Sequence, residues 1–319
     1  MGSSLGPSTP ASSSSAAPVR AAFVVGAPRC GTTFLAKTLA AHPQVCFSKP
    51  KETHFFVRVW PELAPGLRAR ELLRRHFAHR TPAQRLLAEG SPSSLYAPEV
   101  AGRMREFDPA ARFVIAVRNP VDMLASYHAR LLYTLDEDEP DLAAAWALQE
   151  RRARGDALPR RCRDARLLAY RQVCSLGEQV ERFLAAAGAE RCHVVVYDDL
   201  AGDPRKVYLG LLQFLGLDDD GRTRFRRKNE NRSFERAWLQ ALVMNPPPPL
   251  ARLLAAWEVR GLGRPRIVRA LRRRLKKRNT RRRERAPLPP ALRAMLREGF
   301  AADVQRLGAA IGRDLSDWR

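Results

Sequence analysis

Short apolar runs alternate with helical patterns along most of this chain. The runs at 21–25, 112–117 and 192–197 have strand length and few polar positions, and a shorter run lies at 86–88. Continuous apolar strands are typical of a parallel sheet that helices cover on both faces. Helical spacing follows the first run, and further helices are predicted at 98–107, 142–154, 165–187, 204–215 and 290–311. The pattern predicts an α/β fold with a central parallel β-sheet flanked by helices.

The ends of the chain depart from this alternation. Residues 1–20 are rich in Ser, Ala, Pro and Gly, so we predict a disordered tail there. After Asn245 a proline run breaks the pattern, and a basic helical connector at about 258–286 precedes the C-terminal helix at 290–311. We therefore predict a tail followed by one domain over 21–319.

Composition narrows the class of protein. Of the 319 residues 45% are apolar, which is enough for a core and excludes global disorder. The apolar runs are far shorter than the roughly 18 residues of a membrane span, and no secretory signal is recognisable. Five scattered cysteines without CxxC spacing indicate neither a zinc site nor a disulfide framework. We predict a cytoplasmic protein without a metal.

The net charge of +23 is concentrated in one stretch, because 260–285 holds 14 basic residues and one acid. Five of these residues fall on one broad helical face: Arg269, Arg272, Arg273, Lys276 and Lys277. The stretch is either a solvated connector or a contact for an anionic acceptor, an anionic lipid surface or nucleic acid. Nucleic acid is not expected, because the stretch lacks interleaved aromatic residues and a known reader motif.

A glycine loop follows the first predicted strand. Gly26 and Gly31 are separated by four residues, and Thr32 and Thr33 open the next helix. This spacing lets backbone N–H groups and a helix N-terminus surround a phosphate, which predicts a P-loop-type three-layer sandwich. Thr32 stands where a nucleotide triphosphatase has its lysine, and this argues against triphosphate hydrolysis. Arg29 is the one cation inside the loop.

A second candidate phosphate contact follows the strand at 112–117. Arg118 ends that strand, Pro120 suits the first turn of a helix, and Ser126 lies about two turns further on. An arginine fork and a hydroxyl together suit phosphate oxygens. The alternative is structural, with Arg118 paired to Asp122 and Ser126 bonded to the helix backbone.

These two motifs resemble those of one family. Residues 28–33 resemble the 5′-phosphosulfate loop of the sulfotransferases that use 3′-phosphoadenosine-5′-phosphosulfate (PAPS), of the bacterial and glycan-type branch. Residues 118–127 resemble the 3′-phosphate motif, in which a serine comes eight residues after the arginine. Similar stretches occur at 51–56, 89–96, 197–204 and 312–318, so that the resemblance covers nearly the whole chain beyond residue 20.

The resemblance implies PAPS as sulfate donor and no metal. It places five residues at the 5′-phosphosulfate, namely Arg29, Cys30, Gly31, Thr32 and Thr33. It places Arg118 and Ser126 at the 3′-phosphate. It also implies that the basic loop at 226–233, with Lys228 and Arg232, returns over the 3′-phosphate, although a solvated charge run explains that loop equally well. Arg29 would stabilise the charge that develops on the bridging oxygen.

The resemblance also suggests the general base. The family places its catalytic glutamate where this chain has Glu52, which Lys49 and Lys51 flank. His54 is the rival base, because a neutral imidazole is well tuned near pH 7. Next to two phenylalanines, however, His54 also suits a partly buried structural role. Ser91 and Tyr96 either line the pocket or act as a helix cap and a core residue.

The sequence therefore predicts a sulfotransferase that carries a sulfuryl group from PAPS to a hydroxyl of a carbohydrate or small-molecule acceptor. Two alternatives remain. The first is a P-loop kinase or other nucleotide-binding protein, and the second is a basic polyanion-binding protein on a degenerate P-loop fold.

Overall fold

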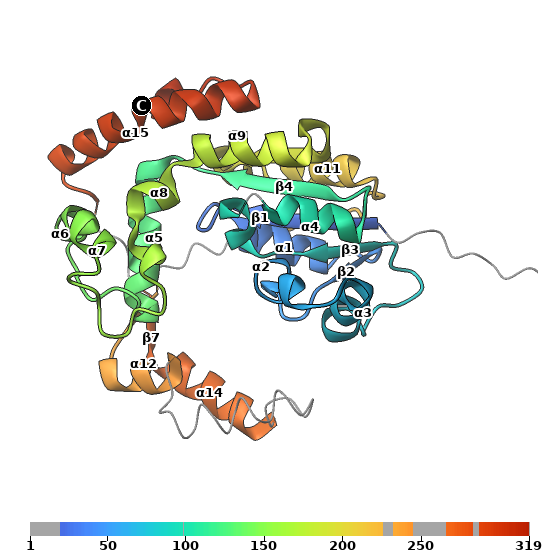
Figure 1. Cartoon of the computed structure of the whole chain (residues 1–319), viewed down its shortest axis with the longest axis horizontal. Coiled ribbons are helices and arrows are strands. Elements are labelled where there is room, and N and C mark those ends of the chain that lie inside the picture. Colours follow the sequence, from blue (N-terminus) through green and yellow to red (C-terminus); the bar gives the residue numbers. More distant parts are fainter. Residues whose placement is uncertain (1–19, 98, 226–231, 245–265, 283–286, 319) are drawn as a thin grey trace, which may run out of the picture.

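Five parallel strands form the central sheet of this protein (Figure 1). The computed structural model describes residues 20–97, 99–225, 232–244, 266–282 and 287–318. The strands are β1 (Arg20–Gly26), β2 (Val45–Phe47), β3 (Leu86–Glu89), β4 (Arg112–Val117) and β5 (Cys192–Val196). Their order is β2-β3-β1-β4-β5, and every pairing is parallel. Both β1 and β4 are almost entirely buried, as their continuous apolar sequences require.

Helices cover both faces of the sheet, which confirms the predicted α/β three-layer class. One face carries α4 (Glu99–Phe107) and α9 (Leu176–Ala187), and α15 (Pro290–Ile311) packs across α9 as an outer helix (Figure 1). The other face carries α1 (Thr32–Ala40) and α11 (Pro204–Leu215). Three short helices lie near the sheet, namely α2 (Phe55–Arg58), α8 (Tyr170–Cys174) and α10 (Tyr197–Gly202), and the longer helix α3 (Pro65–His76) precedes β3.

Two of the predicted helices are broken. The pattern at 142–154 folds as α6 (Leu142–Ala147) and α7 (Gln149–Ala153), and the pattern at 165–187 is interrupted twice before α9. At the second break the hydroxyl of Ser175 donates to the carbonyl oxygen of Arg171, and Asp303 accepts the N–H of Gly177. These contacts pair backbone groups at the point where the helical pattern is interrupted.

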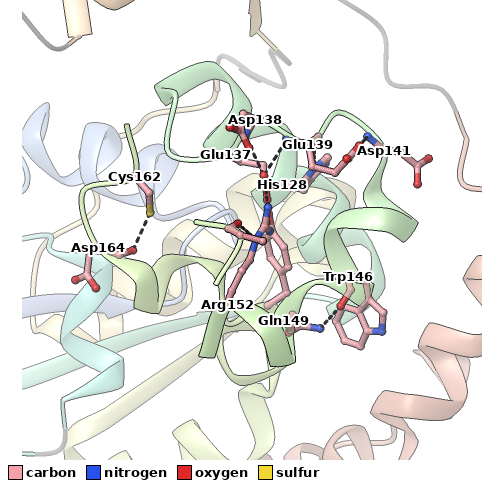
Figure 2. Close-up of polar contacts among 12 residues, drawn as sticks. His128, Glu137, Asp138, Glu139, Asp141, Trp146, Gln149, Arg152, Cys162 and Asp164 are labelled. Atoms are coloured by element: carbon pink, nitrogen blue, oxygen red, sulfur yellow. Dashed lines mark hydrogen bonds and ion pairs between the residues drawn. The ribbon is translucent and has the colours of Figure 1, made fainter. Parts of the chain in front are cut away.

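A buried ion pair holds the segment that follows α5 (Pro120–Thr134). Arg152 donates two hydrogen bonds to Glu137, at 2.6 and 2.7 Å, and Figure 2 shows the two side chains pointing toward one another. Tyr170 donates a third hydrogen bond to the same carboxylate. The ring of His128, on α5, bonds the carbonyl oxygen of Glu139 (Figure 2). This network ties α5, α7 and α8 to the segment at 137–139 that follows α5.

A small basic unit packs below α5 (Figure 1). It consists of α12 (Ala237–Met244), α14 (Arg266–Asn279) and the antiparallel strands β6 (Arg232–Phe234) and β7 (Thr280–Arg282). Tyr133 at the end of α5 anchors it, since its hydroxyl bonds Thr280 and its carbonyl oxygen accepts from Gln240. In the described ranges no helix combines the length and apolar character that crossing a membrane requires.

Candidate active site

The glycine loop lies between β1 and α1, at the carboxyl edge of the sheet. Gly31 has a φ of +94°, and a Cβ there would come within 2.8 Å of the side chain of Leu200. Only glycine therefore fits this position without strain. The N–H of Ala27 donates to the carbonyl oxygen of Ala116 in β4, which fixes the start of the loop. Thr33 is exposed at the first turn of α1, whereas Thr32 is buried.

The backbone of Cys30 forms part of this loop, whereas its side chain points into the core. Its side chain is fully buried, and its sulfur lies 3.7 Å from that of Met123. Burial raises the pKa of the Cys30 thiol to about 12, against the opposing charges of Arg118 and Arg29. The thiol is therefore protonated at neutral pH and is unsuited to act as a nucleophile.

Arg29 joins the two predicted phosphate contacts. Its φ of +66° is in the left-handed region, and its Nε–H donates to the hydroxyl of Ser126 at 2.8 Å. Nη1 of Arg118 lies 3.5 Å from the carbonyl oxygen of Arg29. The residues predicted to bind the two ends of one nucleotide therefore lie together, although 97 positions separate Arg29 from Ser126 in the chain.

The guanidinium of Arg118 is oriented by a ring rather than by a carboxylate. It lies 4.3 Å from the centre of the Tyr197 ring, a distance typical of a cation–π contact. Asp122, which the structural alternative paired with Arg118, instead forms an ion pair with Arg293 of α15 at 3.1 Å. Asn119 caps α5, because its side chain accepts the N–H of Val121. The charge of Arg118 is thus left available for an anionic ligand.

The two candidate bases lie in the loop before α2. Glu52 is half exposed, with 46% of its side chain accessible, and it forms an ion pair with Lys51 at 2.9 Å. His54 adopts a φ of +50°, and its Nδ1 lies 2.9 Å from the hydroxyl of Ser93. Burial, together with the charge of Arg58, lowers the pKa of His54. Its imidazole is therefore neutral near pH 7, and the accessible carboxylate is that of Glu52.

A buried carboxylate that sequence reasoning did not single out organises this loop. Glu89, at the end of β3, accepts the N–H and hydroxyl of Thr53, both at 3.0 Å, and the N–H and hydroxyl of Ser91. Ser91 in turn accepts the N–H of His54. Burial raises the pKa of Glu89, and these hydrogen bonds oppose that rise. Ser91 thus connects Glu89 to the base loop, which is the segment at 52–54 that carries both candidate bases. The hydroxyl of Tyr96 is also buried.

An aromatic pair beside the glycine loop was also missed. The rings of Phe34 and Phe225 are 5.8 Å apart, and both are only partly buried. A sequence signal existed, since Phe34 directly follows Thr33. Lys228 lies outside the described residues, and so does the side chain of Arg232, whose backbone belongs to β6.

Some of the basic residues predicted to form one face of α14 contact other parts of the protein. Arg272 donates to the carbonyl oxygen of Val243 at 3.1 Å, and the ammonium of Lys276 lies 5.6 Å from the centre of the Tyr133 ring. Arg273 and Lys277 are exposed, and the side chain of Arg269 lies outside the described part. Contact of this face with an anionic surface stays a prediction. Within the described ranges no group of three or more His, Cys, Asp or Glu side chains is placed to hold a metal ion.

Comparison with known proteins identifies the family to which this chain is similar. The family described as "Sulfotransferase domain" matches residues 20–238. The crystal structure of a sulfotransferase from Alicyclobacillus acidocaldarius is similar, with 25% sequence identity and a TM-score of 0.62 over 93% of this chain and 98% of that one. The sulfotransferase domain of the Synechococcus PCC 7002 olefin synthase is 19% identical, with a TM-score of 0.43 over 93% of this chain and 96% of that one.

One curated relative is similar over a shorter stretch. The membrane-associated sulfotransferase kil1 of Dictyostelium discoideum is 30% identical over 123 residues. That match covers 38% of this chain and 25% of kil1. The chain thus matches about a quarter of the length of this relative.

Proposed function

The chain belongs to the sulfotransferase family, and from this membership we propose that it transfers the sulfuryl group of PAPS to a hydroxyl of a carbohydrate or small-molecule acceptor. The observation that carries the proposal is the hydrogen bond between Arg29 and Ser126. It supports the proposal because it joins a residue of the loop proposed to bind the 5′-phosphosulfate to one proposed to bind the 3′-phosphate, as a single bisphosphorylated nucleotide requires. A cytoplasmic setting is part of the proposal and rests on the sequence.

The residues around the loop suit the donor in charge and shape. Backbone N–H groups at 30–33 and the threonine hydroxyls would hold the 5′-phosphate at the N-terminus of α1. Arg118 and Ser126 would hold the 3′-phosphate, since a guanidinium fork and a hydroxyl match its oxygens. The rings of Phe34 and Phe225 would stack on the adenine.

In the proposed reaction the acceptor oxygen bonds to sulfur while the bond from sulfur to the bridging phosphate oxygen breaks. Glu52 takes the proton of the acceptor hydroxyl, since its carboxylate is accessible and lies in the loop that Glu89 fixes. Arg29 stabilises the negative charge that develops on the bridging oxygen. The half-buried ring of His54, which bonds Ser93, is the competing base.

Thermal unfolding with adenosine 3′,5′-bisphosphate tests the proposal. A nucleotide present at 100 times its Kd stabilises the folded state by about 2.7 kcal/mol. We expect a clear rise in Tm for the wild type, its loss in Arg118→Ala, and its retention in the control Arg105→Ala on α4. Full stabilisation of Arg118→Ala would overturn the assignment.

The same assay separates the alternatives. A P-loop kinase or triphosphatase would instead prefer ATP with Mg²⁺. A polyanion-binding protein would show neither nucleotide effect, but a steep dependence of polyanion affinity on salt.

A further inference from the structure

A groove opens between α1 and the edge strand β2, with a volume of about 340 Å³. Thr33 and Lys37 line it from one face of α1, and Lys49 and Lys51 line it from the loop that follows β2. The volume falls within the range of about 300–1,000 Å³ that is usual for small-molecule sites. Nothing in the proposed donor site uses this groove beyond Thr33.

The charge of the groove is unusual for this chain. Only seven of the 56 basic residues are lysines, and three of the seven, Lys37, Lys49 and Lys51, line this one groove. No carboxylate lines it. Lys51 is paired with Glu52, whereas Lys37 and Lys49 have no ion pair among the described residues. An anionic group entering the groove would therefore meet two ammonium groups that no carboxylate of the described residues neutralises.

The loop that carries two of these lysines is held in place before any ligand binds. The N–H of Ser48 donates to the carbonyl oxygen of Ala88 at 2.8 Å, and the N–H of Lys49 donates to that of His76 at 3.1 Å. The carbonyl oxygen of Lys51 accepts from the hydroxyl of Ser48 and from the N–H of Gly90. A backbone fixed in this way loses less entropy when it binds a ligand.

The floor of the groove is formed by apolar side chains and by backbone carbonyl oxygens that already accept hydrogen bonds from side chains. Val45 and Phe47 of β2 and two alanines of α1 form its apolar part. His79 donates to the carbonyl oxygen of Phe47 at 3.1 Å, and Gln84 donates to that of Val45 at 3.0 Å. The groove thus suits a ligand with a flat or apolar part beside a negative charge.

The groove also adjoins both parts of the proposed reaction. Thr33, which follows the glycine loop at the start of α1, lines the groove, while Lys51 lines the groove and contacts Glu52. A molecule lying in the groove would extend between the glycine loop and Glu52, the proposed base.

We propose that this groove is an acceptor subsite that selects acceptors carrying a carboxylate or a sulfate or phosphate ester next to the hydroxyl that is sulfated. The inference rests on the proposed function and adds to it the charge of the acceptor. Lys37 and Lys49 determine this specificity by binding the anionic group. Lys51 positions the proposed base.

Two glycosides that differ in one group test the subsite: 4-nitrophenyl β-D-glucuronide, which has a carboxylate, and 4-nitrophenyl β-D-glucoside, which has a hydroxymethyl group. Their binding to the full chain saturated with adenosine 3′,5′-bisphosphate is measured by calorimetry, and sulfuryl transfer to each is measured with labelled PAPS. We expect the wild type to bind the glucuronide about tenfold more tightly than the glucoside, and this preference to weaken as salt is added.

The double variant Lys37→Ala/Lys49→Ala removes the two lysine ammonium groups for which the described part of the chain holds no ion-pair partner. It should abolish the preference for the glucuronide while leaving glucoside and nucleotide affinities within about twofold of the wild type. The matched control Arg105→Ala/Lys206→Ala removes the same charge from exposed positions on α4 and α11, so the preference should persist.

The possible results separate the subsite from the proposed function. Equal binding of the two glycosides by the wild type, or a preference that survives in the double variant, overturns the subsite. Weaker nucleotide binding in the double variant also overturns it, because the groove would then belong to the donor site. Failure of the wild type to bind adenosine 3′,5′-bisphosphate would instead overturn the proposed function.

Discussion

Two acid–base pairs of this protein differ in nearly every physical respect. The side chains of Arg152 and Glu137 are 2% and 0% exposed and share two hydrogen bonds. The side chains of Lys51 and Glu52 are 24% and 46% exposed and share one. Loss of one buried partner leaves a charge away from water, whereas water can replace an exposed partner. The first pair therefore maintains the fold, while the second leaves a carboxylate accessible for chemistry.

The largest expected effect comes from breaking the buried pair. Arg152→Ala should lower the free energy of unfolding by about 3–5 kcal/mol, because the buried carboxylate of Glu137 loses its counter-charge. Urea denaturation measures this change. The control Arg166→Ala breaks an ion pair whose arginine is 89% exposed, and it should cost less than about 1 kcal/mol. An equal loss of unfolding free energy in Arg152→Ala and Arg166→Ala would contradict the proposed difference between buried and exposed ion pairs.

The exposed pair should respond in activity rather than in stability. Glu52→Gln should lower kcat for sulfuryl transfer by about 10²–10⁴, since the acceptor loses its base, while the urea midpoint stays close to that of the wild type. Adenosine 3′,5′-bisphosphate should bind as before. Glu62→Gln, at an exposed position in the neighbouring 60–62 turn, is the matched control. Full turnover in Glu52→Gln would transfer the role of base to His54.

Glu89 lies between these two extremes, because it is buried but bonded to neutral groups. Glu89→Gln should lower the free energy of unfolding by about 1–3 kcal/mol, since its amide N–H₂ would face other donors at Thr53 or Ser91. We also expect a reduced kcat, because both residues belong to the scaffold of the base loop.

The effect of Glu89 on stability should depend on pH. Its pKa is raised in the folded state, so the protonated carboxyl favours folding below the ordinary glutamate pKa, and this contribution is lost as pH rises through the folded value. The advantage of the wild type over Glu89→Gln should therefore shrink from about pH 4 toward pH 7. Denaturation curves across that range measure it, and an advantage that grows with pH would contradict the assignment.

The sequence predicted those parts of the molecule that depend on local patterns. Four of the five strands of the central sheet were visible as apolar runs, but the three-residue apolar run of β2 was not recognised as a strand. The helix predicted at 165–187 breaks where Asp303, far along the chain, accepts the N–H of Gly177. Contacts of this kind leave no periodic signal in the sequence.

The same division holds for the candidate site. Glycine spacing and an arginine after a strand pointed to Gly31 and Arg118, because these features follow from the backbone alone. The contact between the rings of Phe34 and Phe225 and the four hydrogen bonds to Glu89 depend on which segments meet in the fold. The direct contact between Arg29 and Ser126 likewise needed the structure.

The outer side of β2 has a consequence for how this protein meets other chains. An edge strand with bare carbonyl oxygens and N–H groups is a template to which a strand of another molecule can add. In β2 the carbonyl oxygens of Val45 and Phe47 already accept from Gln84 and His79. An incoming strand would have to displace both side chains before it could pair, so aggregation through this end of the sheet is opposed by the native contacts themselves.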